Sequence, residues 1–224
     1  GKTLEWFPAE ADTKVLSGWF WNSSHAVKTV GQIIDIYNAS VGRNANLLLN
    51  LSPDTRGLIP ENQITPLIEA YSVIRQTYAR NLAADGSIIA DSTLDGQGAE
   101  NILDGDLDTW WEPAAGNTTP SLTLSLPEPV TFDRIVLQEA IATRSQRIES
   151  FSVDAWLDGA WAEIGNATTV GHKRILVLPE TTTDQVRIRI TQSRLEPSLA
   201  SIGLHEGATL LASPSIGNRD AEGR

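Results

Sequence analysis

Two stretches of the first eighty residues repeat apolar side chains at helical spacing. In residues 27–41 and in residues 61–78 the apolar positions recur three or four residues apart, which predicts two amphipathic helices. Residues 46–51 form a continuous apolar run, as expected for a strand buried on both faces. Residues 15–21 form a shorter apolar run and are predicted to be a strand as well. The predicted order is strand, helix, strand, helix.

Local signals mark the ends of these elements. Ser23 or Ser24 can cap the first helix, and Gly42 can end it. Pro53 and Gly57 predict a turn directly after the second strand. Residues 1–82 therefore form one α/β unit, too short to close a barrel of parallel strands by itself.

The pattern changes after residue 82, where helical periodicity ends. Short apolar or alternating runs then follow one another, separated by Gly, Pro and Asp turns, which is typical of an antiparallel sandwich. The predicted strands are residues 121–126, 134–137, 150–155, 174–178, 185–191 and 202–205. We assign residues 83–207 to this all-β domain. Residues 208–224 lack a large aromatic residue and end in polar residues, which predicts a loosely held tail.

Composition narrows the choice of partners. The formal net charge of −11 argues against nucleic acid or an anionic membrane as the main partner. No apolar run approaches the length of a membrane span. Cysteine is absent, which excludes disulfides and thiol chemistry. Methionine is absent too and the chain begins Gly1-Lys2-Thr3, so we interpret it as a piece of a longer protein.

Tryptophan is concentrated near the start of the chain. Trp6, Trp19 and Trp21 fall within sixteen residues, and Glu10 and Asp12 lie between them. Indole faces beside carboxylates suit a sugar, because ring C–H groups pack on indole while hydroxyls bond to the acids. The alternative is that these tryptophans fill the folding core. For Glu10 the alternative is a buried structural acid paired with Lys14 or Arg43.

Three ordered motifs carry a family resemblance. They are W-x-P-x-E-x-D at residues 6–12, G-W-F-W at residues 18–21 and S-V-G-R-N-A-N-L-L-L-N-L-S-P-D-T-R-G at residues 40–57. They resemble the C-terminal part of the catalytic domain of family 29 α-L-fucosidases, most closely the subgroup that acts on branched 1,3/1,4-linked fucose. One departure is the V-L-S-G at residues 15–18, where that subgroup has arginine before proline and glycine.

This resemblance implies that residues 1–82 are the C-terminal part of a (β/α)8-type barrel. It implies a retaining exo-α-L-fucosidase whose aspartate nucleophile and carboxyl acid/base both precede residue 6, so no catalytic residue lies in this chain. The implied substrate is a fucosylated glycan, bound by Trp19, Trp21 and Glu10. The implied partner is the N-terminal barrel part of the same protein, either continuous with this chain or held as a separate chain, and without it the chain should be inert. No cofactor is expected for catalysis.

Residues 101–111, together with several later strands, resemble the F5/8 type C domain. This discoidin-like, galactose-binding-like jelly roll is also called the family 32 carbohydrate-binding module. The resemblance implies a structural calcium ion held by Asn101, Asp104, Asp106 and Thr109. Ser201 stands where a glutamate often completes that site. The alternative is a hydrogen-bonded Asx turn without a metal.

Two clusters in the sandwich leave their roles open. Trp156 and Trp161 are predicted to be core residues. A basic cluster could face a sugar or could tie the sandwich to the barrel; it consists of Arg147, His172, Lys173 and Arg174.

Two functions from different classes remain. The first is a secreted, periplasmic or otherwise extracellular α-L-fucosidase, and the second is a carbohydrate-binding or adhesion module without activity. The motifs at residues 6–12 and 40–57 favour the enzyme, since a free-standing binding module has no use for part of a barrel. A purely structural domain does not explain the clustered tryptophans.

Overall fold

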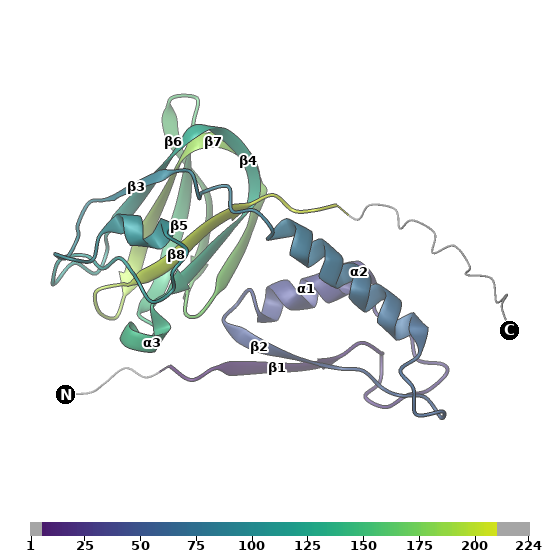
Figure 1. The fold of residues 1–224 in the computed structure, drawn as a ribbon. Coiled ribbons are helices and arrows are strands. Elements are labelled where there is room, and N and C mark those ends of the chain that lie inside the picture. Colours follow the sequence, from purple (N-terminus) through teal and green to yellow (C-terminus); the bar gives the residue numbers. More distant parts are fainter. Residues whose placement is uncertain (1–5, 210–224) are drawn as a thin grey trace, which may run out of the picture.

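The computed structural model describes residues 6–209, and its first part is a small α/β unit. Its elements are β1 (Ala9–Lys14), α1 (Val30–Ser40), β2 (Ala45–Asn50) and α2 (Glu61–Thr77). The two strands pair in parallel, with Ala9 opposite Ala45 and Lys14 opposite Asn50. Both helices lie on one side of this two-stranded sheet (Figure 1).

The start of α1 corrects the predicted cap. Thr29, not Ser23 or Ser24, is the N-cap: its hydroxyl accepts from the Gln32 amide at 3.3 Å, and the Gln32 side chain accepts from the Thr29 amide at 3.0 Å. This reciprocal pair satisfies two helix-end donors at once. Ser24 instead donates to the Asn22 side chain in a local turn. Gly42 follows the helix as predicted, and its amide donates to the Tyr37 carbonyl.

The strand predicted at residues 15–21 is wrong. The regular strand lies just upstream and ends at Lys14, while residues 15–21 form an irregular bend. Val15 and Leu16 are buried because this bend packs against residues 26–28, with Leu16 bridged to Val27. The apolar run reflects that burial rather than strand pairing.

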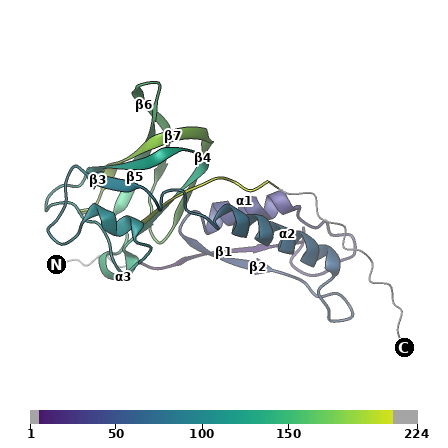
Figure 2. The ribbon, with the colours of Figure 1, turned by 45° about the horizontal axis from the view of Figure 1, so that its top comes forward.

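The second part of the chain is an antiparallel sheet domain consistent with a β-sandwich. Its elements are β3 (Ser87–Ala90), η1 (Ala99–Leu103), β4 (Ser121–Glu139), α3 (Ile141–Arg144), β5 (Ile148–Leu157), β6 (Ala160–Thr168), β7 (Arg174–Ser193) and β8 (Leu199–His205). The strand order is β3-β4-β7-β5-β6, and β8 pairs with β4. Figure 2 shows the sheet curling over itself. β4 and β7 are long strands whose register shifts let them bend around the core.

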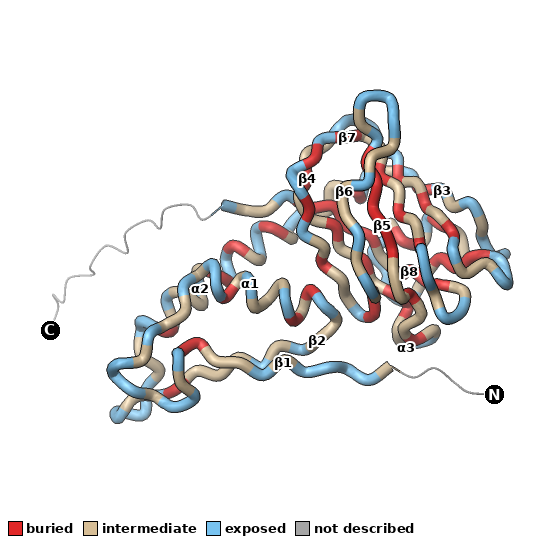
Figure 3. Tube along the Cα trace, turned by 180° about the vertical axis from the view of Figure 1, so that it is seen from behind, coloured by how far each residue is buried: buried red, intermediate tan, exposed pale blue. Residues whose placement is uncertain are grey.

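The six predicted strands all lie in this sheet, but two pairs of them are halves of longer strands. Residues 121–126 and 134–137 belong to β4, and residues 174–178 and 185–191 belong to β7. β3 and β6 were not predicted. The core is continuous through the sheet domain, as the red segments in Figure 3 show, and it includes the fully buried Trp111.

Trp156 and Trp161 are not core residues. They pair edge to face at the end of the β5–β6 hairpin, with ring centroids 5.3 Å apart, and Trp156 is 36% exposed. The Arg187 guanidinium lies over the Trp161 ring at 4.6 Å. The strands alternate faces, and these tryptophans fall on the outward one.

The two parts of the chain meet at a joint formed by Gly42, Arg43 and Asn44. The Gly42 carbonyl accepts from the Ile175 amide at 2.9 Å, and Arg43 forms a bridge with Arg174. The Asn44 side chain accepts from the His172 amide at 2.6 Å. His172 and Arg174 therefore serve the tie between the domains, one of the two alternatives open for this cluster.

Asn44 makes this joint possible through an unusual backbone. Its φ of +68° lies in the left-handed region, which asparagine tolerates better than most residues. Its amide group also donates to the Gln146 side chain at 3.0 Å and packs directly on Gly171, where any Cβ would clash. One short side chain thus joins two loops of the sandwich to the start of β2.

Two further expectations concern the ends and the surface. The predicted tail lies outside the described residues from 210 onward, while the Ala208 amide donates to the Thr77 hydroxyl. Within residues 6–209 no helix has the length and apolarity that crossing a membrane requires.

We predict that Asn44→Gly weakens the joint without straining the backbone. Glycine adopts positive φ freely, so the change isolates the two side-chain hydrogen bonds, and we expect a loss of about 1–3 kcal/mol in unfolding free energy. Asn44→Ala should lose more, because alanine also opposes the left-handed backbone. Urea unfolding of the three proteins tests this order. Equal midpoints for wild type and Asn44→Gly would contradict it.

Candidate functional site

A hollow of about 440 Å³ opens where β1 and β2 both end. It is lined by residues that follow the two strands: Trp19, Phe20, Trp21, Asn50, Leu51, Ser52, Pro53, Asp54 and Thr55. Parallel strands bring their carboxyl ends to the same edge, so two segments thirty residues apart in sequence share one wall. The hollow combines exposed indole with hydroxyl, amide and carboxylate groups.

Trp19 is held in the hollow by its backbone. Its carbonyl accepts from the Asn50 side chain at 3.0 Å and from the Ser52 hydroxyl at 2.9 Å. Trp19 is 46% exposed, and the Lys14 ammonium lies over its ring, 4.8 Å from the centroid. Lys14 therefore covers part of one indole face, and the exposed remainder of the ring is available to a ligand.

Trp21 lies between this hollow and a neighbouring one of about 360 Å³, which His25 also lines. The His25 ring packs against Gly18, where a Cβ would come within 2.0 Å of the ring, and its Nδ1 lies 3.1 Å from the Phe20 carbonyl. His25 therefore braces the bend that carries both tryptophans. The predicted strand geometry for Trp19 and Trp21 is wrong, yet the bend still brings both to one hollow.

Gln63 is a positioning residue that the sequence did not reveal. It is fully buried in the first turn of α2, and its side chain accepts from the Ser52 amide at 3.1 Å and donates to the Ser52 carbonyl at 2.8 Å. This pair fixes the strand end that holds Trp19. Nearby, the hydrogen bond from Arg56 lowers the pKa of the Asp54 carboxyl, which therefore stays ionised.

Glu10 lies apart from the tryptophans. It is exposed near the start of β1, opposite Asn46, and does not line the hollow. Among the interactions of the described residues, Glu10 makes no ion pair with Lys14 or Arg43, so the structure gives no support to the alternative of a buried paired acid. Glu10 as a sugar contact stays a prediction.

The predicted calcium ligands are partly gathered. The Thr109 hydroxyl donates to Asp104 at 2.7 Å and lies 3.0 Å from the Asp106 carbonyl, while the Asp106 amide donates to the other Asp104 oxygen. Asn101 anchors the base of this loop through the Trp110 carbonyl. Ser201 lies elsewhere, since it lines a cavity with Tyr37, Tyr78 and other residues between the two domains.

The donors in this loop fit the chemistry of calcium but are also satisfied without it. Both Asp104 oxygens accept hydrogen bonds within the loop, which is the geometry of an Asx turn. Over residues 6–209 no group of three or more His, Asp or Glu side chains is placed to hold a metal. Calcium binding stays a prediction that depends on Asp104, Asp106 and Thr109.

A buried carboxylate organises the loops beside the joint. Glu139, at the end of β4, is 4% exposed and accepts from the backbone amides of Arg147 at 2.7 Å, Ile148 at 2.9 Å and Gly171 at 2.6 Å. Burial raises the pKa of Glu139 to about 7, although these three amides favour its charged form. Arg147 turns away to the buried Glu112, so it faces the protein interior.

The two parts of the chain match two different family models. The Alpha-L-fucosidase family model matches residues 2–70, and the F5/8 type C domain model matches residues 87–203. The chain belongs to the α-L-fucosidase family and carries an F5/8 type C domain.

Relatives match both parts of this chain. A protein of Oryza sativa subsp. japonica described as putative alpha-L-fucosidase 1 is 32% identical over 206 residues, covering 89% of this chain and 40% of the relative. A putative alpha-L-fucosidase structure from Bacteroides thetaiotaomicron is 29% identical with a TM-score of 0.86, covering 91% of this chain and 46% of that one. A Ruminococcus gnavus GH29 fucosidase in complex with fucose is 28% identical with a TM-score of 0.83, covering 91% of this chain and 42% of that one. The chain thus spans about two fifths of the curated relative.

We predict that Glu139 makes the stability of the F5/8 type C domain depend on pH. Its pKa is 4.5 in the unfolded reference and about 7 in the fold, so the folded state binds more protons between these values. Its contribution to unfolding free energy therefore falls as pH rises from 4.5 to 7, by about 3 kcal/mol. Glu139→Gln should remove this slope and lower stability at pH 5, because an amide nitrogen would face a backbone donor. Urea unfolding at pH 5 and pH 7 measures both effects, and identical pH dependence in the variant would contradict the assignment.

The calcium prediction is tested by heating. If the Asp104 loop holds the ion, excess calcium should raise the melting temperature and a chelator should lower it, by a few degrees or more. Asp104→Ala should abolish the difference between the two conditions. If neither calcium nor the chelator changes the melting temperature of the wild type, the loop is an Asx turn without a metal.

Proposed function

We propose that this chain is the C-terminal part of a retaining exo-α-L-fucosidase that removes terminal α-linked fucose from oligosaccharides or glycoconjugates. The main support for this proposal is the hollow at the ends of β1 and β2, which Trp19 and Trp21 line. The second support is the match of residues 2–70 to the α-L-fucosidase family. The proposal extends to 1,3/1,4 linkages, as the subgroup resemblance implies. It also places the protein outside the cytoplasm.

The α/β unit supports a barrel origin. β1, α1 and β2 form a strand–helix–strand unit with adjacent parallel strands, the repeating element of (β/α)8 barrels. Among the described residues neither β1 nor β2 has a second strand partner, and Leu48 is 53% exposed. Open parallel edges require neighbours. We infer that these are further barrel strands from the part of the full-length protein outside this chain.

The chemistry is divided between the two parts. A retaining glycosidase uses a carboxylate nucleophile and a carboxylic acid about 5 Å apart. We assign both to the barrel strands outside this chain, and no catalytic residue to this one. Trp19 then packs on the apolar face of fucose, Trp21 extends that wall, and Glu10 is a third candidate contact. Active sites of such barrels lie at the carboxyl ends of the strands, where the hollow is found.

A second candidate is a carbohydrate-binding module without activity. The F5/8 type C domain favours it, since this domain takes up residues 87–203. The fucosidase match of residues 2–70 and the rigid joint between the two parts favour the enzyme. The chain without the remaining barrel strands is expected to be inert in either case.

We predict that Trp19→Ala in the full-length protein raises KM and lowers kcat/KM for an α-L-fucoside by about tenfold or more. Loss of one stacking surface of about 1.4 kcal/mol accounts for a factor of ten. Trp156→Ala is the matched control, because Trp156 is also an exposed tryptophan but lies on the sandwich. Steady-state kinetics on a fucosylated trisaccharide and on its fucose-free form test the proposal. No fucose release by wild type would refute it, and unchanged kinetics in Trp19→Ala would remove the residue assignment.

A further inference from the structure

Two arginines lie opposite each other at the joint between the domains. Arg43 and Arg174 form an isolated antiparallel bridge. The Ile175 amide donates to the Gly42 carbonyl at 2.9 Å, so the two arginines are a non-hydrogen-bonded pair, the kind in which side chains approach most closely. Their side chains share one face, where like charges repel. Within residues 6–209 neither guanidinium makes an ion pair or a side-chain hydrogen bond.

The other arginines of the sandwich show that this arrangement is unusual. Every other arginine between residues 83 and 207 makes an ion pair: Arg134, Arg144, Arg147, Arg187, Arg189 and Arg194. The chain has 28 acidic residues against 17 lysines and arginines, so acids are not scarce. Arg174 is the exception, and its Nε is buried without a hydrogen-bond partner in the described part of the chain. A buried donor without a partner is rare and points to a missing acceptor.

The two positive charges repel each other. Burial, and then the charge of Arg43, lowers the pKa of the Arg174 guanidinium, which still stays protonated at neutral pH. A partly buried cation beside a like charge destabilises a fold unless an anion compensates it. A carboxylate has two oxygens and can accept hydrogen bonds from both guanidiniums, in the paired geometry that arginine favours.

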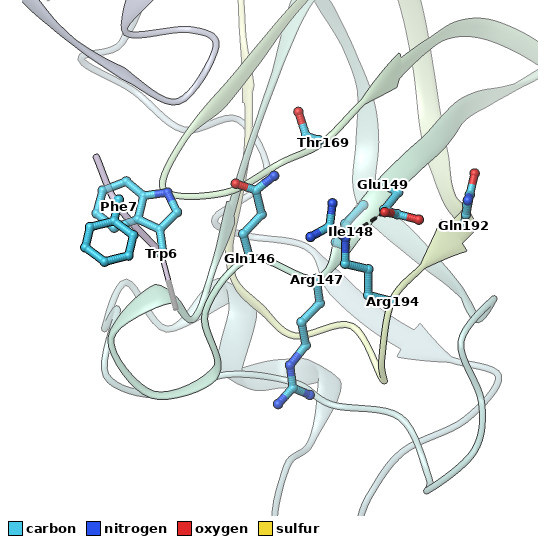
Figure 4. Close-up of a pocket in the computed structure, with 9 residues that line it drawn as sticks. All are labelled: Trp6, Phe7, Gln146, Arg147, Ile148, Glu149, Thr169, Gln192 and Arg194. Atoms are coloured by element: carbon cyan, nitrogen blue, oxygen red, sulfur yellow. Dashed lines mark hydrogen bonds and ion pairs between the residues drawn. The ribbon is translucent and has the colours of Figure 1, made fainter. Parts of the chain in front are cut away.

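Apolar surface beside the pair is exposed as well. Ala9 and Ala45 are opposite each other at the starts of β1 and β2. Phe7 and Arg43 each stand two residues earlier, and Phe7 is 78% exposed. Figure 4 shows the rings of Trp6 and Phe7 together at one end of a cavity that sandwich residues also line, and the buried indole N–H of Trp6 has no hydrogen-bond partner within residues 6–209. Aromatic rings and arginine together are typical of protein interfaces.

The position of the pair indicates what covers it. It lies at the amino ends of β1 and β2, at the opposite end of these strands from the hollow beside Trp19. Among the described residues β1 has only β2 as a partner, and the chain covers 40% of the Oryza relative. Parallel strands begin at the same edge of a sheet, so the loops that lead into further barrel strands would lie beside Arg43. A free anion would account for the charges but not for the exposed ring of Phe7.

We propose that Arg43 and Arg174 together bind a carboxylate side chain from the barrel part of the full-length protein that precedes Trp6, and that this contact fixes the sandwich to the barrel. The carboxylate compensates both guanidiniums, and Phe7 packs against the same segment. The inference rests on the proposed barrel origin of this chain, but not on activity toward fucosides. It places the contact at the amino ends of the strands, the face of such barrels that serves stability.

The first test is the sign of a stability change in the full-length protein. If a carboxylate pairs with the arginines, Arg174→Met leaves that acid unpaired and should lower the melting temperature at pH 7 by about 2 °C or more. If no carboxylate is there, the same variant removes a repelled charge, and an unchanged or higher melting temperature would overturn the proposal. Arg194→Met is the matched control, since Arg194 is 61% exposed in its pair with Glu149 and should matter less.

Zero-length cross-linking of the full-length protein identifies the acid. Arg43→Lys places an amine at the pair, and a carbodiimide joins an amine to a carboxylate only where the two are in contact. Peptide mass spectrometry should find position 43 joined to an Asp or Glu that precedes Trp6. Arg194→Lys is the positive control and should be joined to Glu149. If the control reacts while position 43 stays unjoined, or is joined only to acids within residues 6–209, the proposal is wrong.

Inorganic phosphate distinguishes an open anion site from one that the protein fills. If phosphate raises the melting temperature of the wild type but not of Arg43→Met, the pair is open to solvent ions and the proposal is overturned. Fucose release on the same samples tests the proposed function separately. The expected cross-link in an inactive protein supports this inference and refutes only the activity, whereas an active protein without the cross-link refutes this inference alone.

Discussion

The orientation of the two domains depends on one buried carboxylate. Glu139 accepts three backbone hydrogen bonds, two from the turn before β5 and one from the turn before β7. Those two turns present Gln146 and His172 to Asn44, whose side chain bonds to both. Removing the acceptor would leave three buried N–H groups unpaired, which is more costly than the loss of three ordinary contacts. The joint is therefore supported by hydrogen bonds to Asn44 on one side and to Glu139 on the other.

This joint distinguishes the sandwich from a module on a linker. The chain between α2 and β3 is short, and its Asn81 side chain bonds to the β8 backbone at Ile202 and Leu204. Two connections, at Asn44 and at Asn81, fix a domain against rotation better than either alone. The sandwich consequently stabilises the α/β unit through contacts at two separate places.

Sequence reasoning recovered α1 and α2 because apolar residues recur at helical spacing along both, and it recovered β2 because its sequence holds a short continuous apolar run. It failed at residues 15–21, where only Val15 and Leu16 are buried and the chain then bends, leaving Trp19 and Phe20 exposed. It missed β6, whose apolar residues are interrupted by Glu163, Gly165 and Asn166 and form no continuous run or strict alternation. The prediction that Trp156 and Trp161 are core residues was wrong because tryptophan occurs both in protein cores and in partly exposed aromatic pairs.

The sequence predicted those residues of the candidate site whose type alone suggests a function. Trp19 and Trp21 stood out by their clustering, and both line the hollow. Gln63, Asn44 and Glu139 did not stand out, because a polar residue gains its role from the backbone groups it meets in three dimensions. Nothing in a single sequence distinguishes the Glu139 that accepts three amides from a glutamate in solvent.

β2 connects the joint between the domains with the hollow beside Trp19. Asn44 precedes its first residue, at the joint, and Asn50 is its last residue, where it bonds to the Trp19 carbonyl. Six residues of strand span about 20 Å, so the joint and the hollow beside Trp19 lie at opposite ends of one extended element. Because backbone geometry fixes the length of a strand, β2 sets the distance between the joint and the hollow. The V-G-R-N and L-N-L-S segments therefore belong to one motif for a physical reason. The first segment contacts the sandwich, and the second holds Trp19 in place through its carbonyl.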